Sequence, residues 1–154
     1  MSTTMQKEMW IMGRSRLTNQ LGNIEEADLL KQVRPESNTA GWLLRHIAEV
    51  ELLFAKNVFE KALNIKAQTI GSMARDRGQF TDLQQLLDII QRAEDELGAA
   101  ISAVDDWSEK VTTAEFGTIT KAEALGRIMT HTAYHAGQLA LVIKYGEVNK
   151  SRDT

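Results

Sequence analysis

The chain contains no cysteine, and this absence removes several kinds of chemistry at once. Disulfides, thiolate metal sites and cysteine nucleophiles are all excluded. Any metal ion must therefore be held by histidine or carboxylate ligands. Residues that interrupt helices are also scarce, because the 154 residues include one proline and ten glycines. This favours long helices over many short strands joined by turns.

Two further absences narrow the class of partner. The net charge is −3 and there is no dense tract of lysine and arginine, so we expect no nucleic-acid partner. No apolar run approaches the roughly 20 residues of a transmembrane helix, so we expect no membrane partner. Residues 1–8 lack the apolar core of a signal peptide, so we expect a cytoplasmic protein.

The length and the apolar fraction of 43% predict one globular domain, residues 1–154, with four long helices. The expected helices run from about Thr4 to Gly22, from about Ala40 to Leu63, from Thr81 to about Asp105, and from Thr120 to Tyr145. The last two open with the capping-box patterns Thr81–Gln84 and Thr120–Glu123. These segments predict an all-α fold, a four-helix bundle.

Finer features of the pattern complete this prediction. In the first helix an apolar stripe is expected on one face, formed by Met5, Met9, Met12, Leu17 and Leu21. We interpret residues 24–33 as a polar connection with room for one helical turn, and residues 66–79 as a loop that can border a site. A β-prone stretch is expected at residues 116–119, and residues 149–154 form a polar tail.

All three histidines of the chain are placed where metal ligands would be needed. His131 and His135 are four residues apart in the fourth helix, so their imidazoles share one face. His46 lies on the apolar side of the second helix. Two histidines from one helix and one from another can converge on a single ion in a bundle, leaving a coordination position open as in catalytic zinc sites. We predict a divalent metal site; the alternative is three hydrogen-bonded core histidines.

The chemistry of such a site would differ from that of the zincin metalloproteases. Thr132 stands where the zincin motif needs its glutamate base. Three neutral imidazoles leave the ion its full charge, so a bound water would have a pKa of about 7 and a bound thiol would be deprotonated.

Three side chains near the histidines are candidates for supporting roles. Glu49, one turn after His46, could orient an imidazole or a bound water, although a solvated helix charge is the plainer interpretation. Gln138 could bond to substrate or to a ligand histidine, or simply be a buried amide. Glu51 points away from His46, and we expect it to pair with Arg14 or Arg16.

At these residues the sequence resembles the DinB/YfiT-like superfamily of metalloenzymes. The matching segments are Asn38-Thr-Ala-Gly-Trp-Leu-Leu-Arg-His46 and His131-Thr-Ala-Tyr-His-Ala-Gly-Gln-Leu139, and the resemblance covers nearly the whole chain. It implies a four-helix bundle with up-down-down-up connectivity, often assembled as a homodimer. It also implies that His46, His131 and His135 bind zinc or nickel. Relatives often carry arginine after the last ligand, where this chain has Ala136.

The resemblance leaves three hypotheses for function. Members with known activity include transferases and isomerases that use low-molecular-weight thiols such as bacillithiol or mycothiol. We therefore expect a metal-dependent enzyme that transfers such a thiol, as co-substrate, to an electrophilic small-molecule substrate. The second hypothesis is a hydrolase that uses metal-bound hydroxide. The third is a non-catalytic bundle that binds metal or a small ligand, or merely dimerises.

Overall fold

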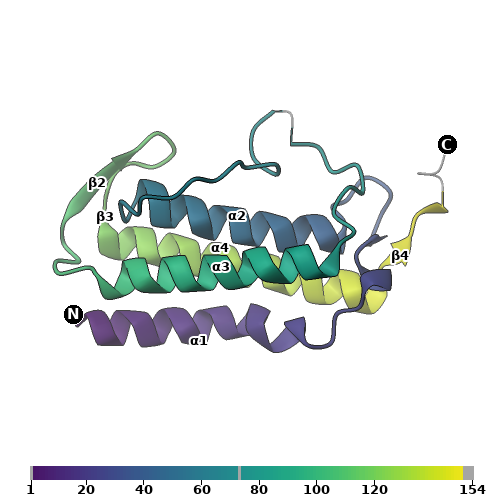
Figure 1. Ribbon diagram of the computed structural model, residues 1–154, viewed down its shortest axis with the longest axis horizontal. Helices are drawn as coiled ribbons and strands as arrows, with labels where there is room; N and C mark the ends of the chain where they lie inside the picture. The colour runs from purple at the N-terminus through teal and green to yellow at the C-terminus, as the bar shows by residue number, and fades with distance from the viewer. Residues whose placement is uncertain (1, 73, 151–154) are drawn as a thin grey trace.

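The computed structural model describes residues 2–72 and 74–150, and it contains four long helices. They are α1 (Thr3–Leu21), α2 (Ala40–Asn57), α3 (Leu83–Ser102) and α4 (Lys121–Tyr145). Figure 1 shows that α1 and α4 run in one direction along the bundle and that α2 and α3 run in the other. This is the expected up-down-down-up order, and the predicted all-α four-helix bundle is confirmed.

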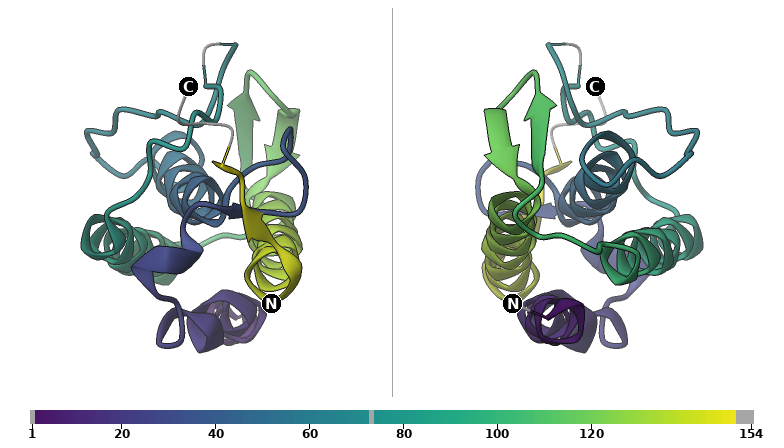
Figure 2. Two further views of the ribbon diagram at one scale, coloured as in Figure 1. Left: turned by 90° about the vertical axis from the view of Figure 1, so that its right-hand side faces the viewer. Right: turned by 90° about the vertical axis from the view of Figure 1, so that its left-hand side faces the viewer.

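The helices occupy the four corners of the bundle when it is seen end on. Figure 2 shows α1 and α2 on opposite sides, with α3 and α4 between them. In this arrangement α2 packs against both α3 and α4, and α1 packs against the same two helices. The long connection between α2 and α3 lies on the outer side of α2, as does the hairpin that precedes α4.

Two small antiparallel sheets and one short helical turn complete the structure. Strand β2 (Lys110–Thr113) pairs with β3 (Gly117–Thr120), which contains most of the predicted β-prone stretch. Strand β1 (Lys31–Gln32) pairs with β4 (Glu147–Val148), and the sequence did not predict this pair. A 3-10 turn, η1 (Glu26–Asp28), lies in the connection where one helical turn was expected.

Side-chain caps fix the starts of the helices. The Thr39 hydroxyl accepts a hydrogen bond from the Trp42 amide, and the Thr120 hydroxyl accepts one from the Glu123 amide, as the sequence predicts for α4. The predicted capping box at Thr81 is wrong. The N-cap of α3 is Asp82, whose carboxylate accepts from the Gln85 amide. Aspartate caps a helix at least as well as threonine, so the helix begins one residue later than the pattern suggested.

Helix α2 ends six residues before the predicted Leu63, since its last residue is Asn57. The cause lies in the backbone just beyond it. Glu60 has a φ of 58°, in the left-handed region that a right-handed helix cannot contain. The chain then turns back, and the amide of Lys61 bonds to the carbonyl of Ala55 at 2.9 Å. Residues 58–82 therefore form a long connection that lies along α2 (Figure 1).

The predicted apolar stripe of α1 is wrong at its three methionines, which are exposed, whereas Leu17 is buried and Leu21 packs against the core. Met5, Met9 and Met12 are 52%, 40% and 67% exposed. The buried face carries Gln6, Trp10, Arg14 and Leu17 instead. Apolar character alone therefore mislocated the face that packs in the bundle.

A buried ion pair explains why a charged residue occupies the inner face of α1. The Nη2 of Arg14 lies 3.0 Å from the Oε2 of Glu51 on α2, and both side chains are almost fully buried. The same guanidinium reaches Glu94 and the carbonyl of Ile90 on α3. On α4 the hydroxyl of Thr132 donates to Glu51 at 3.0 Å. The predicted pairing of Glu51 with a first-helix arginine is confirmed, and the network connects all four helices.

The surface features complete the description of the bundle. No helix in the described part of the chain is long and apolar enough to span a bilayer. Of the expected polar tail, Asn149 and Lys150 are half-buried and exposed, respectively, and residues 151–154 lie outside the described residues.

Candidate metal centre

The structure brings His46, His131 and His135 together between α2 and α4. One nitrogen from each ring can be chosen so that all three lie within 4.8 Å of one another. The Nε2 atoms of His46 and His131 are 3.2 Å apart. Tetrahedral zinc with Zn–N bonds of about 2.0–2.1 Å would place neighbouring ligand nitrogens about 3.3 Å apart. The cluster is therefore compatible with a single metal ion.

The ring of His46 is oriented by a chain of two hydrogen bonds that begins at Glu49. The Thr69 hydroxyl donates to Oε2 of Glu49 at 2.5 Å, and its oxygen lies 3.1 Å from Nδ1 of His46. Because the single hydroxyl proton is given to the carboxylate, the oxygen can only accept from His46. Nδ1 of His46 therefore carries its proton, and the lone pair is on Nε2, the atom that faces His131.

Glu49 is fully buried and its carboxylate is saturated with donors. It accepts from the backbone amides of Gln68 and Thr69, both at 2.9 Å, and from Nε of Arg45 at 2.6 Å. The prediction that Glu49 orients an imidazole thus has a structural basis, although the contact is indirect. The alternative of a solvated helix charge is wrong for this residue. The connection at residues 66–79 borders the site, as interpreted from the sequence.

The second candidate, Gln138, touches its histidine directly. Its Oε1 lies 2.6 Å from Nδ1 of His135. The amide oxygen can only accept, so Nδ1 of His135 is the donor and Nε2 carries the lone pair. This is the arrangement found around metal-bound histidines, in which a partner on the outer nitrogen fixes the tautomer.

His131 is held differently. Its Nδ1 is buried and has no hydrogen-bond partner among the described residues, while its Nε2 faces His46. Its neighbour Thr132 is turned into the core, where it bonds to Glu51. The position occupied by the base in zincins therefore serves the packing of this bundle.

The electrostatic setting keeps His46 and His131 neutral. Burial lowers the pKa of His46 to about 4, and the neighbouring His135 acts in the same direction. Burial, followed by His135 and His46, lowers the pKa of His131 to about 3. A metal ion needs unprotonated imidazoles, so these two rings are in the binding form at neutral pH.

Two contacts in the site were not assigned from the sequence. Thr69 lies in a stretch without helical or strand periodicity, so nothing in the pattern marked it. Trp42 stacks on His46, with ring centroids 4.6 Å apart and planes 16° apart. Its spacing of four residues before His46 was the available signal.

The two residues that follow His135 lie in different settings. A Cβ at Gly137 would meet no atom within 4 Å, so close helix packing does not require glycine there. Ala136 is fully buried in the core, and its carbonyl accepts from Gln20 of α1 at 2.9 Å. The position where relatives often carry arginine therefore faces α1 in this chain.

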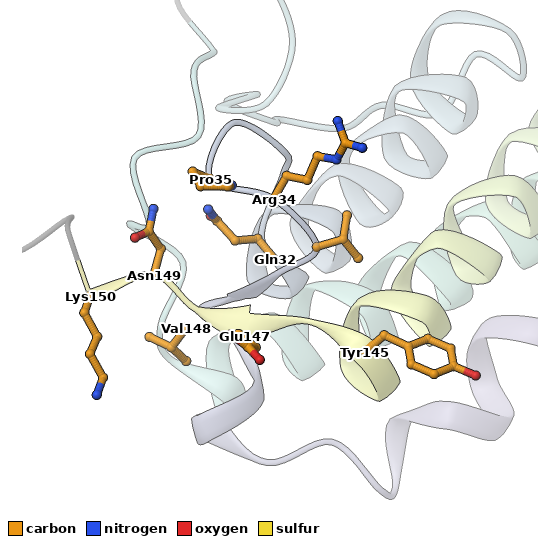
Figure 3. Close-up of a pocket in the computed structure, with 9 residues that line it drawn as sticks. Gln32, Arg34, Pro35, Tyr145, Glu147, Val148, Asn149 and Lys150 are labelled. Carbon is orange, nitrogen blue, oxygen red and sulfur yellow. The ribbon is translucent and has the colours of Figure 1, made fainter.

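A polar cavity of about 520 Å³ lies elsewhere, against the β1–β4 pair. The amide of Gln32 is buried there without a hydrogen-bond partner among the described residues. Figure 3 shows, however, that Lys150 and Tyr145 point away from Gln32. This cavity therefore lacks the converging groups that the histidine cluster has.

Comparison with known proteins agrees with the resemblance. The family model described as the DinB superfamily matches residues 9–139, and the chain belongs to this superfamily. The same comparisons found no match among curated proteins and none among solved structures.

Proposed function

We propose that this DinB-superfamily chain is a metal-dependent enzyme that transfers a low-molecular-weight thiol to an electrophilic small molecule. The observation that carries the proposal is the convergence of three imidazoles, two of which have their Nδ1 protons held by Thr69 and Gln138. We propose zinc or nickel as the ion, because imidazole ligands suit both. Once bound, the ion would supply Lewis acidity and favour the thiolate form of the thiol.

The residues around the cluster favour thiol transfer over hydrolysis. Among the described residues the metal-binding group consists of histidines alone, without a carboxylate. The nearest candidate base, Glu49, is occupied by four donors, and Thr132 is bonded to Glu51. Activating water benefits from a positioned general base, whereas a thiol ionises far more readily.

The transfer itself requires little of the protein beyond positioning. The thiol sulfur forms a bond to the electrophilic carbon as the leaving group departs with the bonding electron pair. The thiol proton passes to solvent. Thr69 and Gln138 hold the rings of His46 and His135 in one orientation while this happens.

Elemental analysis of protein purified without a histidine tag tests the metal site first. We expect about one zinc or nickel per chain, and none in the His131→Ala/His135→Ala variant. Absence of metal, with no uptake of added zinc or nickel, would identify core histidines and support the non-catalytic alternative.

Assays of the metal-loaded protein then separate the enzymatic alternatives. Turnover of an electrophile such as iodoacetamide should depend on an added small thiol. Turnover of esters or amides without any thiol would instead support the hydrolase. The inferred homodimer and the cytoplasmic location rest on the resemblance and on the sequence; sedimentation velocity and cell fractionation test them.

A further inference from the structure

A second cavity, of about 540 Å³, lies toward the end of the bundle that carries the β2–β3 hairpin. Three parts of the chain enclose it: the C-terminal half of α2, the connection after Thr69, and the hairpin. The apolar side chains that line it are Val50, Leu53, Phe54, Val58, Ile70, Ala114 and Phe116. Figure 2 shows the connection and the hairpin both on the α2 side of the bundle, away from α1.

The residues that line the cavity are neighbours of the histidine cluster along α2 and along the connection. Val50 is one turn after His46, and Leu53 is two turns after it, so the three residues share a face of the helix. Ile70 directly follows Thr69, whose hydroxyl bonds to His46. The lining of the cavity therefore starts one helical turn after His46 on α2 and one residue after Thr69 on the connection.

The opposite side of His46 is covered. Trp42 stacks against the imidazole from the preceding turn of α2, and its side chain is buried. A small molecule that reaches the cluster along α2 therefore approaches from the Val50 side.

The hairpin is held against α4 at the outer end of this cavity. The Arg127 guanidinium lies 4.5 Å from the centre of the Phe116 ring, and it bonds to Glu123 at 2.8 Å. Arg127 is one turn before His131 on α4. The ring of Phe116 is also 6.0 Å from the ring of Phe54 on α2. The ring of Phe116 thus contacts both α2 and α4, the two helices that carry the three histidines.

We propose that this cavity binds an aryl or alkyl arm of the electrophilic substrate while the reacting carbon lies at the histidine cluster. The inference rests on the proposed function and names its substrate class. The cavity has the size and apolar lining of small-molecule sites, which span about 300–1,000 Å³. Ile70 is 42% exposed, so a ligand would cover apolar surface that water now contacts. Glu115 also lines the cavity, and its carboxylate would repel an anionic substituent on that arm.

Direct binding of an unreactive probe tests the proposal. The probe is 4-nitrobenzyl alcohol, a neutral mimic of the electrophile 4-nitrobenzyl chloride, titrated by calorimetry into metal-free and zinc-loaded protein. Because side chains rather than the ion form the cavity, we expect saturable binding to both. Leu53→Trp, which fills the cavity, should raise the Kd at least tenfold.

Leu141→Trp is the matched control. Leu141 lines a different cavity, on the Gln138 side of the cluster, and is itself 56% exposed. This variant should change the Kd less than twofold. Should Leu53→Trp fail to fold by circular dichroism, Ile70→Asp places a charge in the same lining from an exposed position and should weaken binding equally.

The outcomes separate this inference from the proposed function. Two results would overturn the apolar subsite. The first is that the native protein does not bind the probe. The second is that Leu141→Trp loses binding while the Leu53 or Ile70 variant binds as the native protein does. If iodoacetamide is turned over with thiol while the aryl alcohol does not bind, the subsite alone is wrong. If the alcohol binds as described but no thiol transfer occurs, the cavity is a ligand site and the transferase proposal is wrong.

Discussion

The Thr69 hydroxyl oxygen lies 3.1 Å from Nδ1 of His46, and the hydroxyl donates a hydrogen bond to Glu49. This relation makes a residue of an irregular connection responsible for the orientation of a candidate ligand on α2. The hydrogen bond between Thr69 and Glu49 is buried, since Thr69 is 4% exposed and Glu49 is fully buried. A buried donor or acceptor that loses its partner keeps the full cost of desolvation, so the pairing is strongly preferred.

Thr69→Val should therefore weaken metal binding. Valine keeps the shape but removes the hydroxyl, and loss of such an outer partner typically costs about 10–100-fold in metal affinity. Zinc affinity measured by competition with a chromophoric chelator should fall by that range, while Thr69→Ser should stay near the native value. In the metal-free protein, ¹⁵N chemical shifts should show more of the Nε2-protonated tautomer of His46 in the valine variant. An unchanged tautomer and an unchanged Kd would show that Thr69 is only a packing residue.

Gln138 should play the same part for His135, but with a different dependence on chemistry. Gln138→Leu removes the acceptor of the 2.6 Å hydrogen bond and should raise the zinc Kd by about tenfold or more. Gln138→Glu retains an acceptor and should bind at least as tightly as the native protein. Equal weakening by both substitutions would contradict a role in holding Nδ1 of His135. Calorimetry of zinc binding at neutral pH distinguishes these cases.

The metal-free protein should lose stability as the solution becomes acidic. The pKa values of His46 and His131 are lowered from 6.5 to about 4 and about 3 by burial and by neighbouring rings. The unfolded chain therefore binds protons at these residues more readily than the folded chain does. Their contribution is fully present above pH 6.5 and is lost as the pH falls through the folded-state values.

Urea unfolding of metal-free protein at pH 7 and pH 5 measures this effect. The free energy of unfolding should be lower at pH 5, and the difference should shrink in His46→Gln/His131→Gln, whose side chains do not titrate. A double variant with the same pH dependence as the native protein would assign the loss to carboxylates elsewhere.

The sequence predicted the helices and the histidine cluster better than it predicted their surroundings. The start of α4 at the Thr120 cap and the meeting of His131 with His135 follow from local spacing, which one helix determines by itself. His46 joins them because the order of the helices sets α2 beside α4, and the resemblance supplied that order. Local rules operate over a few residues, so they were accurate where the structure depends on a few residues.

Two of the errors, at the inner face of α1 and at Thr69, depend on contacts between distant segments. The inner face of α1 was assigned from its methionines, but Arg14 is buried because Glu51 on another helix pairs with it. The end of α2 was extended to Leu63 because a turn at Glu60 leaves no signature in apolar periodicity. Thr69 could not be selected, because its role exists only once Glu49 and His46 are folded beside it.

The pair formed by Arg14 and Glu51 should dominate the stability of the helix packing. Burial raises the pKa of the Glu51 carboxyl, and the adjacent guanidinium opposes that shift. Arg14→Met would leave the carboxyl buried without its cation, which typically costs about 3–5 kcal/mol. The double variant Arg14→Met/Glu51→Met should recover most of the loss, because neither charge then remains uncompensated.

A more exposed ion pair provides the control for these two variants. Lys61 and Glu96 are 3.3 Å apart with side chains 37% and 30% exposed, and Lys61→Met should change stability by less than about 1 kcal/mol. Chemical denaturation of the native protein, Arg14→Met, Arg14→Met/Glu51→Met and Lys61→Met gives the comparison. If Arg14→Met were as mild as Lys61→Met, the buried network would not be what holds α1 to α2.

Gly41, in the first turn of α2, should be far less tolerant of a side chain than Gly137 in α4. A Cβ at Gly41 would lie 2.1 Å from the carbonyl oxygen of Phe80 and 3.2 Å from that of Leu29. Both contacts are with backbone, so either the connection or the helix must move. Gly41→Ala should destabilise the protein by about 1–3 kcal/mol or more. Because the displaced helix carries His46, it should also raise the zinc Kd.

Gly137→Ala makes the same chemical change where the added methyl meets no atom within 4 Å. The position is two residues after the candidate ligand His135 on α4, yet the substitution should stabilise the helix by roughly 0.5–1 kcal/mol, since alanine loses less backbone entropy than glycine. Thermal unfolding and zinc titration of the two variants measure both effects. A destabilised Gly137→Ala with a weakened metal site would mean that a second chain or a ligand closely covers that face of α4.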